Sequence, residues 1–479
     1  SRCARAAHAR SGPMIGAVSA LKLVLAAGLL PLAVAGGPGE LGAARAAAQG
    51  AGRFERAVAT QAATQVRLRV LGDAFVCPDA RFVSYRRSDA EPEVVDQWYV
   101  ASQLWADAEL LLAVARERIA PRITQIPAGS GRPLPGGWDE PETRCHLDKG
   151  FIFLDRLWDY ESAGYFPRSN PVGTDVSRGP RYADDNALAG LALLAAAEAA
   201  PAGPSRQRYL HAARREAEFL TDSGPWAESG LWDDTFGGGF WWNTGKGDTA
   251  EGKPAQTNAI AALFFARLYE ATGDEAHRDW ALRTLRWLDT VLYDPSRELY
   301  RWSVGYEDPE NQLGAVVHGR YFNYDQAIAL EAQILAARLA DDPGRLSRAR
   351  AIGRALPPAF WNEARGGYNL EVGVDQVYTS YSAWTGLGHL ALYDLDGDTR
   401  WFELARENAD ALAAVLRGTD GSYAYRYYRC VDRVAPGCES GEVTWVVDPT
   451  LDTSAQAWAQ HLETALGARG VPRHPPRGE

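Results

Sequence analysis

The sequence lacks the features that mark a membrane-spanning chain, a metal centre or a nucleic-acid-binding surface. The apolar run from Leu23 to Ala35 is too short to cross a bilayer, and no other stretch is long enough. No Cys-x-x-Cys pair or Cys/His cluster occurs at metal-ligand spacing. Lys and Arg number 50 against 61 Asp and Glu, which gives a net charge of -11 without basic clusters. We therefore expect no metal, no cofactor, no nucleic acid partner and an uncharged ligand.

The short apolar run has the flanks of a targeting segment. Basic residues precede it, and Ala-x-Ala sequences typical of cleavage sites follow at 33–35 and 46–48. Residues 1–48 are therefore predicted to be a signal peptide with upstream residues. We expect the mature protein outside the cell or in the periplasm, without a membrane span and as a monomer.

Four cysteines remain after such a cleavage, an even number that suits an oxidising compartment. Cys430 and Cys438 form the more convincing pair because a Pro-Gly turn lies between them. Elimination then leaves Cys77 to pair with Cys145. The sequence therefore predicts two disulfides.

Alternating runs typical of β-strands are few, and the best flank the Cys430/Cys438 turn at 423–428 and 443–447.

The main feature is an internal repeat of helix pairs. LYEATGDEAHRDWALRTLRWLDTVL from Leu268 aligns without gaps with LYDLDGDTRWFELARENADALAAVL from Leu392. In both copies the helix before the Gly-Asp turn is apolar nearly all round and the helix after it is amphipathic. This pattern predicts a buried inner helix followed by an outer one.

The same order of inner and outer helix occurs elsewhere in the chain. Residues 186–200 precede 205–220, residues 322–339 precede 344–356, and single helical stretches at 95–119, 151–160 and 451–466 could complete a ring. Repeated helical hairpins form either an α-solenoid or a closed barrel. We assign residues 49–94 to an N-terminal segment, 95–470 to the helical domain and 471–479 to a flexible tail.

A polar and aromatic cluster stands just before each apolar inner helix. The clusters are Tyr182 to Asn186, Thr257-Asn258, Tyr321 to Gln326 and Tyr378 to Trp384. If the helices close into a barrel, all inner helices start at one end and the clusters converge there. Helix capping explains single Asp, Asn and Ser residues at such places, but it does not explain the accompanying aromatic rings. Convergent rings with carboxylates and amides are typical of a carbohydrate cleft.

Asp184 and Asp185 are adjacent carboxylates at one of these helix starts, where both can lean toward the same opening. Cleavage of a glycosidic bond needs one ionised and one protonated carboxyl group. Two nearby like charges separate their titrations, and the helix N-terminus favours the ionised form of one of them. A doubled Asp at a helix start is, by itself, more often a cap than a catalyst. Its aromatic surroundings favour catalysis.

Four elements together resemble glycoside hydrolase family 76, the retaining endo-α-1,6-mannanases. They are YADDNA at 182–187, GGGFWWN at 237–243, TNAIAALFFARLYEATGD at 257–274 and FNYDQA at 322–327. The resemblance covers roughly residues 95–466 and implies an all-α (α/α)6 barrel, with a small disulfide-linked β-hairpin outside it. It also implies Asp184 as the nucleophile, Asp185 as the general acid/base, and a polysaccharide or oligosaccharide of the α-mannan type as the substrate.

The same resemblance implies a set of substrate-binding residues. They are Tyr182, Asn186, Trp241, Trp242, Asn243, Asn258, Tyr324, Asp325 and Gln326. Asp325 stands where the family pattern has Asn, and Ala327 where it has Gly. An additional acid near the cleft would favour a substrate bearing an amine or a differently placed hydroxyl. One of Trp241 and Trp242 is expected to be a core anchor.

Other acidic groups have simpler interpretations. Asp233-Asp234 lies in a loop ahead of the Gly run, where it is structural or binds substrate at the rim. The run Asp394-x-Asp396-Gly-Asp398 resembles the opening of a calcium loop but lacks the remaining ligands, which favours an ordinary turn between helices.

Three other functions fit the same pattern. A sugar epimerase on this barrel would need paired histidines, for which His318 and His389 are the candidates. A non-catalytic glycan-binding protein would not need the intact Asp pair. A transglycosidase would use the same residues as the hydrolase and would pass the glycosyl group to a sugar.

Overall fold

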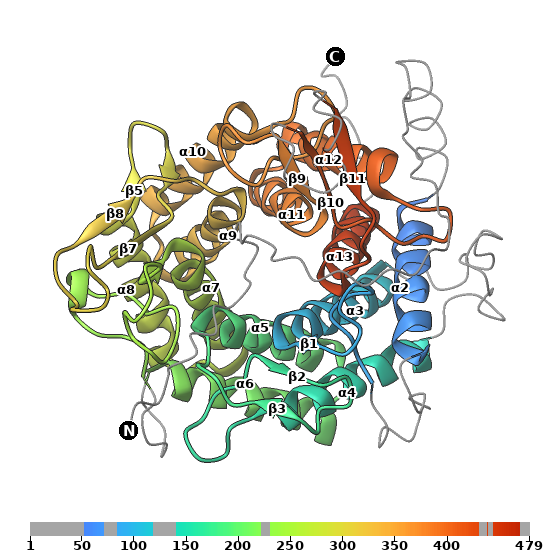
Figure 1. Ribbon diagram of the computed structural model, residues 1–479, viewed down its shortest axis with the longest axis horizontal. Helices are drawn as coiled ribbons and strands as arrows, with labels where there is room; N and C mark the ends of the chain where they lie inside the picture. Colours follow the sequence, from blue (N-terminus) through green and yellow to red (C-terminus); the bar gives the residue numbers. More distant parts are fainter. Residues whose placement is uncertain are drawn as a thin grey trace.

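The computed structural model describes residues 52–70, 84–117, 140–221, 230–430, 438 and 444–469. Twelve α-helices in these ranges form two concentric rings, as the view down the axis shows (Figure 1). The inner helices are α3 (Gln97–Glu117), α5 (Ala183–Ala199), α7 (Ala255–Thr272), α9 (Asn323–Ala340), α11 (Thr379–Asp396) and α13 (Thr453–Arg469). The outer helices are α2 (Arg53–Val70), α4 (Glu140–Leu157), α6 (Pro204–Thr221), α8 (Glu275–Val291), α10 (Pro343–Phe360) and α12 (Thr399–Leu416).

The inner ring is closed. Each inner helix packs against the next one, and α13 packs back against α3. Each inner helix also packs against one outer helix, so the (α/α)6 barrel is confirmed and the open solenoid is excluded. The outer partner of α13 is α2, which comes from the segment 49–94. The chain therefore closes the barrel by joining its first described helix to its last.

Composition explains which helices are inner. In α5 the run Ala183 to Ala197 is buried on every side, because it consists largely of Ala and Leu. Gly190 lets α5 approach α7 closely, since a Cβ there would come within 2.4 Å of the Phe264 ring. The outer helix α8, in contrast, buries one face, which includes Leu285 and Leu288.

Aspartates begin three outer helices. Asp274, Asp342 and Asp398 each accept a hydrogen bond from a backbone N–H at the start of α8, α10 and α12. Gly397, just before α12, is in the left-handed conformation, with φ of 71°. The run from Asp394 to Asp398 is therefore the expected turn between helices. The described residues contain no group of three or more His, Cys, Asp or Glu side chains placed to hold a metal ion.

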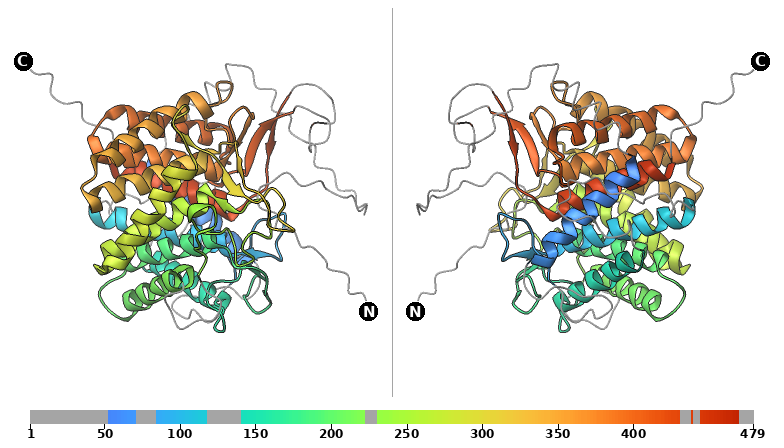
Figure 2. Two further views of the ribbon diagram at one scale, coloured as in Figure 1. Left: turned by 90° about the vertical axis from the view of Figure 1, so that its left-hand side faces the viewer. Right: turned by 90° about the vertical axis from the view of Figure 1, so that its right-hand side faces the viewer.

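Short strands lie at one end of the barrel, where Figure 2 shows β10 and β11 projecting beyond the helices. Three sheets have three strands each: β1 (Val95–Asp96), β2 (Arg168–Ser169) and β3 (Val176–Ser177); β4 (Lys253–Pro254), β7 (Ser303–Gly305) and β8 (Val316–His318); and β9 (Gln376–Tyr378), β10 (Arg426–Arg429) and β11 (Trp445–Asp448). A further pair joins β5 (Tyr293–Asp294) to β6 (Leu299–Tyr300), and all these pairings are antiparallel.

The predicted disulfide-linked hairpin is present. Strands β10 and β11 pair from Arg426 with Asp448 to Arg429 with Trp445. The disulfide between Cys430 and Cys438 closes the connection, with a Cα–Cα distance of 5.5 Å. Cys145 is also disulfide-bonded, while its predicted partner Cys77 lies outside the described residues.

The fourth helix differs from its prediction. Helix α4 starts at Glu140, eleven residues before the predicted start at 151. Acidic residues at 140 and 142 with Pro141 between them make a favourable first turn, which explains the early start. None of the described helices is long and apolar enough to cross a membrane.

Candidate active site

The starts of the inner helices share one device. The fourth residue of each of α5, α7, α9, α11 and α13 is polar, and its side-chain oxygen accepts the backbone N–H of an aromatic residue in the preceding loop. These pairs are Asn186 with Tyr165, Asn258 with Phe240, Gln326 with Tyr300, Ser382 with Tyr368 and Gln456 with Tyr423. We call these five side chains the helix clamps. They fix where each inner helix begins, and so where the second and third residues of that helix lie.

Three of the predicted substrate-binding residues are helix clamps. Asn186, Asn258 and Gln326 have no exposed surface. The amide NH2 of each donates to two backbone carbonyl oxygens, which include those of Tyr182, Pro254 and Phe322. Their amide groups therefore hold the backbone, and a contact with substrate stays a prediction.

Asp184 and Asp185, called the Asp pair below, are the second and third residues of α5. Their side chains are almost fully buried, with 6% and 3% of their surface exposed. The Asp184 carboxylate accepts one hydrogen bond from the backbone N–H of Asp185 at 3.0 Å and another from Trp242 Nε1 at 3.1 Å. Tyr182, the residue before this helix, makes no side-chain cap. The Asp184 carboxylate instead accepts the N–H of Asp185, one of the first-turn groups that have no acceptor within the helix backbone.

The two tryptophans of the Gly-rich loop, residues 237–243, have different environments. Trp241 is only 1% exposed, donates from Nε1 to Asp233 Oδ2 at 2.5 Å and stacks on Tyr306. Trp242 is half-buried and packs edge-on against Tyr182, with ring centroids 4.9 Å apart. Trp241 is therefore the core anchor, and Trp242 is the ring beside the Asp pair.

Asn243 and Tyr182 join the same loop to α5. Their backbones form a β-bridge, and the Asn243 side chain accepts the N–H of Gly245 at 2.6 Å. The Ala183 N–H donates to the Trp242 carbonyl at 2.8 Å. The loop therefore lies antiparallel against the residues that start α5, which positions Trp242 next to Asp184.

Aromatic rings from α9 and α11 complete the neighbourhood. Tyr324 and Tyr381 lie with ring centroids 4.8 Å apart. Burial raises the pKa of both hydroxyl groups, and the negative charge of Asp184 adds to this rise in both. The charge of Asp185 also raises the pKa of Tyr381. Both hydroxyls therefore stay protonated within electrostatic reach of the Asp pair.

Asp325 is the third residue of α9, the same place that Asp185 occupies in α5. It has no exposed surface, and neither carboxyl oxygen makes a hydrogen bond of ordinary geometry. Burial raises the pKa of Asp325 well above its usual value, against the opposing influence of the Gln256 backbone N–H. The additional acid predicted near the cleft is thus covered by protein, and its burial disfavours the charged form.

Sequence reasoning missed a further acid, Asp452, which directly precedes α13. Its Oδ1 accepts the N–H of Ala455 at 3.0 Å, and only 4% of its surface is exposed. Burial raises the pKa of Asp452 to about 7, and its charge acts on Tyr381 together with that of the Asp pair. A signal was available, because Asp452 stands at an inner-helix start like Asp184.

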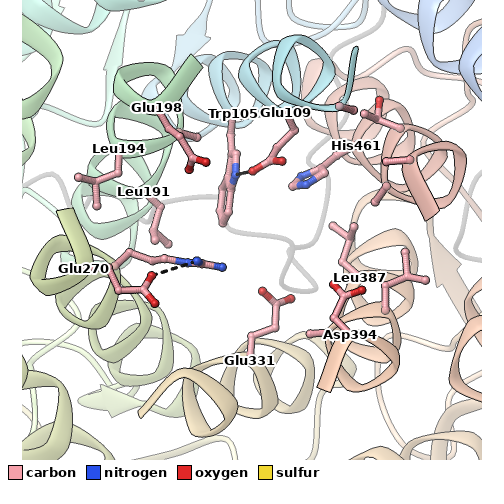
Figure 3. Close-up of a pocket in the computed structure, with 18 of the residues that line it drawn as sticks. Trp105, Glu109, Leu191, Leu194, Glu198, Glu270, Glu331, Leu387, Asp394 and His461 are labelled. Atoms are coloured by element: carbon pink, nitrogen blue, oxygen red, sulfur yellow. Dashed lines mark hydrogen bonds and ion pairs between the residues drawn. The ribbon is translucent and has the colours of Figure 1, made fainter. Parts of the chain in front are cut away.

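A cavity of about 640 Å³ lies toward the end of the barrel opposite the Asp pair, where the inner helices end (Figure 3). Charged side chains line it, with at least one from each inner helix: Glu109, Glu198, Arg267, Glu270, Glu331, Asp394 and Arg469. Burial raises the pKa of Glu331 to about 7. The Asp pair is not among the lining residues, so this cavity is separate from the candidate active site.

The (α/α)6 barrel and its acid pair among aromatic rings describe a glycoside hydrolase. Residues 173–382 match the model of glycosyl hydrolase family 76, which identifies a family 76 domain in this part of the chain. The matched stretch contains the Asp pair, the Gly-rich loop and Tyr381. No curated protein matches the sequence.

Solved structures share the fold. An α-mannanase of family 76 from Bacteroides thetaiotaomicron has a TM-score of 0.63 and 16% identity, covering 89% of this chain and 98% of that one. An inactive variant of the α-1,6-mannanase of Salegentibacter sp., in complex with α-1,6-mannotetrose, has a TM-score of 0.59 and 18% identity, covering 87% and 99%. A sugar epimerase from a ruminal bacterium has a TM-score of 0.57 and 12% identity, covering 83% and 94%. At these identities the likeness concerns the fold.

Proposed function

We propose that this protein is a secreted, retaining glycoside hydrolase that cleaves internal α-1,6-mannosidic bonds of α-mannan. The observation that carries the proposal is the pair of buried carboxylates at the start of α5, one of which is held by Trp242. The similar Salegentibacter structure supports it, because that inactive α-1,6-mannanase has two consecutive aspartates replaced by alanine.

In the proposed mechanism, Asp184 attacks the anomeric carbon while Asp185 donates a proton to the departing glycosidic oxygen. The bond between the anomeric carbon and that oxygen breaks, and an ester to Asp184 forms. Asp185, now ionised, takes a proton from water as the water oxygen attacks the same carbon. The ester bond to Asp184 breaks, and the product keeps the α-configuration. The two hydrogen bonds to Asp184 favour it as the nucleophile, since they hold its oxygens in place.

The side chains around the Asp pair favour an uncharged sugar chain. Tyr182, Trp242, Tyr324 and Tyr381 supply rings from three inner-helix starts and the Gly-rich loop. Asp325 has no exposed surface and its burial disfavours the charged form, so it does not offer the exposed charge that an amine on the substrate would need. These features support a neutral mannan.

The environments of the two histidines weigh against the epimerase alternative. His389 has no exposed surface and stacks on Trp401, and burial lowers its pKa to about 4. His318 lies on β8, where its Nε2 is 3.1 Å from the carbonyl oxygen of Ala250. Neither has the other as a partner in these contacts, as a pair of catalytic histidines would.

Secretion is part of the proposal and rests on the targeting segment, which lies outside the described residues. The disulfide between Cys430 and Cys438 supports it, since such bonds persist in oxidising compartments. Expression of the full chain in a bacterial host with fractionation tests this part. The expected result is processed protein in the periplasm or medium with the disulfide intact, and full-length protein retained in the cytoplasm would contradict it.

The activity is tested by incubating the purified protein with unbranched α-1,6-mannan beside other α-mannans and α-glucans. Reducing ends and product lengths are followed over time, and the anomeric configuration of the first product is read by NMR. We expect mid-sized oligosaccharides early, with the α-configuration. Products longer than the substrate would indicate a transglycosidase, and binding without cleavage would indicate a glycan-binding protein. An inverted product would exclude the mechanism.

A further inference from the structure

Lys253 is a buried cation behind the candidate active site. It lies on β4, and its side chain has no exposed surface. The chain has 50 Lys and Arg residues, yet only four are lysines: Lys22, Lys149, Lys246 and Lys253. A lysine fully buried in so arginine-rich a chain indicates a place where a compact ammonium is needed.

The Lys253 ammonium is surrounded by oxygen atoms from a single loop. Its three N–H groups are shared among four acceptors: Asp233 Oδ1 at 2.7 Å and the backbone carbonyl oxygens of Asp233 at 3.1 Å, Thr235 at 2.8 Å and Gly238 at 2.8 Å. It also lies 4.6 Å from the centre of the Trp241 ring. Four acceptors and an aromatic face around one point form a cation cage.

The backbone that forms the cage is unusual. Phe236, Gly237, Gly238 and Gly239 all have positive φ, between 57° and 121°. At Gly239 a Cβ would come within 2.6 Å of the Trp287 ring. The turn directs carbonyl oxygens to one point, where they would repel each other without a cation. The ammonium therefore compensates for a conformation that the loop would otherwise avoid.

The ammonium is present at neutral pH. Burial lowers the pKa of Lys253 to about 8, against the opposing influence of hydrogen bonding to Asp233 and the charges of Asp233 and Asp234. The pKa of Asp233 is lowered by its hydrogen bonds to Lys253 and Trp241, despite an opposing effect of burial. Both partners are therefore charged under ordinary conditions.

The cage connects to the Asp pair by a short path. The loop that surrounds Lys253 continues into Trp241 and Trp242, and we call residues 233–243 the Trp loop. The N–H of Trp242 donates to the carbonyl of Gly252, the residue before Lys253, at 2.9 Å. The Trp242 indole in turn donates to Asp184. The Lys253 ammonium thus holds the first part of the Trp loop, and the Gly252 carbonyl holds its last part at Trp242. The Trp242 indole then orients the proposed nucleophile.

We propose that Lys253 is a positioning residue, whose ammonium acts as a built-in cation that folds the Trp loop and so aims the Trp242 N–H at Asp184. The catalytic part of this inference rests on the proposed function. Arginine is a poor substitute, because a planar guanidinium cannot direct its N–H groups to four acceptors around one point.

Chemical rescue tests the cage directly. Lys253→Ala removes the ammonium and leaves a cavity beside the four oxygens, which n-propylammonium has the size and charge to fill. We expect kcat on α-1,6-mannan to fall about 100-fold with little change in KM, because the lost hydrogen bond acts on the reacting carboxylate. Added n-propylammonium should restore at least a tenth of the activity and show saturation. Lys246→Ala, the matched control on the adjacent segment, should keep its activity and show no response to the amine.

A measurement independent of catalysis separates this inference from the proposed function. In protein with ¹⁵N-labelled tryptophan, the Trp242 Nε1–H signal is assigned by its loss in Trp242→Phe. We expect this signal to shift in Lys253→Ala and to return with n-propylammonium. If the wild type cleaves no mannan, the activity proposal fails while this signal still tests the cage.

Two outcomes would overturn the inference. One is a folded Lys253→Ala protein whose Trp242 signal is unchanged. The other is a disturbed signal that the amine does not restore, although propionamide, a neutral compound of similar size, does so. Should Lys253→Ala fail to fold even with the amine, Asp233→Asn replaces it, since this variant weakens the cage without removing its shape. It should shift the Trp242 signal, and an unchanged signal would contradict the cage.

Discussion

The first turns of α5 and α9 have almost the same backbone and opposite acid chemistry. Each follows an extended aromatic residue, Tyr182 or Phe322, without a side-chain cap, and each has a clamp at its fourth residue. Each also has an Asp at its third residue. The α5 turn has a second carboxylate that accepts from Trp242, whereas Asp325 in α9 has no such donor. The position of an acid in this barrel therefore does not decide its role, because the adjoining loop does.

Replacing the third residue in each turn should give the largest contrast. We expect Asp185→Asn to lower kcat on the best substrate by several orders of magnitude, because it removes one partner of the acid pair. Asp184→Asn, at the second residue, should have an effect of the same size. Asp325→Asn should retain most activity. Steady-state rates with circular dichroism as the folding control measure this. Near-normal turnover in Asp184→Asn or Asp185→Asn would remove the catalytic assignment.

The clamps should matter equally in the two turns. Asn186→Leu and Gln326→Leu each leave one backbone N–H and two carbonyls without their partner, so both should lose about 2–5 kcal/mol of unfolding free energy. Urea denaturation measures the loss. The exposed Gln312, whose amide has no role in a clamp, supplies the control Gln312→Leu. A large loss of unfolding free energy in only one of the two variants would show that the helix clamps do not have the same structural role in α5 and α9.

Removing the indole donor makes the α5 turn more like the α9 turn. Trp242→Phe keeps a ring against Tyr182 but loses the N–H to Asp184, and kcat should fall about 10–100-fold, as expected for a hydrogen bond to a charged group. The corresponding change at the core anchor, Trp241→Phe, should act mainly on stability. If Trp242→Phe and Trp241→Phe were equally stable and lowered kcat equally, the two rings would not have the different roles assigned to them.

The smallest effect concerns stability at Asp325. Its pKa is higher in the folded than in the unfolded chain, so the unfolded chain releases the proton first as pH rises above about 4. Folding stability contributed by this group is thus present at low pH and lost with rising pH. Asp325→Asn removes that dependence and should be more stable than wild type at pH 7, with no gain at pH 4. Urea unfolding at the two pH values measures it, and equal gains at both would contradict the buried neutral acid.

Much of this arrangement could be predicted from the sequence, because it depends on local patterns. The repeat at Leu268 and Leu392, and the contrast between apolar and amphipathic helices, identified both rings. Helix α2 was not recognised as part of the barrel, since its partners there lie far away in the sequence. Arg56 is 2% exposed and pairs with Glu463, over 400 residues away. The apolar face of α2 is small, with Phe54, Ala57 and Val58 in one cluster with residues of α3.

The site was predictable to a similar degree. Family motifs pointed to the Asp pair and Trp242, but the distinct roles of Asn258 and Lys253 depend on which backbone atoms approach them. Those partners, such as Phe240 and Gly238, lie 15 or more residues away in a loop of irregular conformation. Sequence pattern alone does not specify such contacts. The burial of Asp325 has the same origin, because packing between α7 and α9 decides it.

The helix clamps have a consequence for how this barrel acquires new chemistry. A clamp uses the fourth residue of an inner helix and the backbone of the preceding loop, and it makes no demand on the second and third residues. Those positions can therefore change identity without moving the helix start. Across α5, α7, α9 and α11 they are already Asp-Asp, Gln-Thr, Tyr-Asp and Ser-Tyr. Substitution at one such pair can install or delete a reactive group while the scaffold persists, so mutational libraries aimed at new sugar specificities belong at these positions.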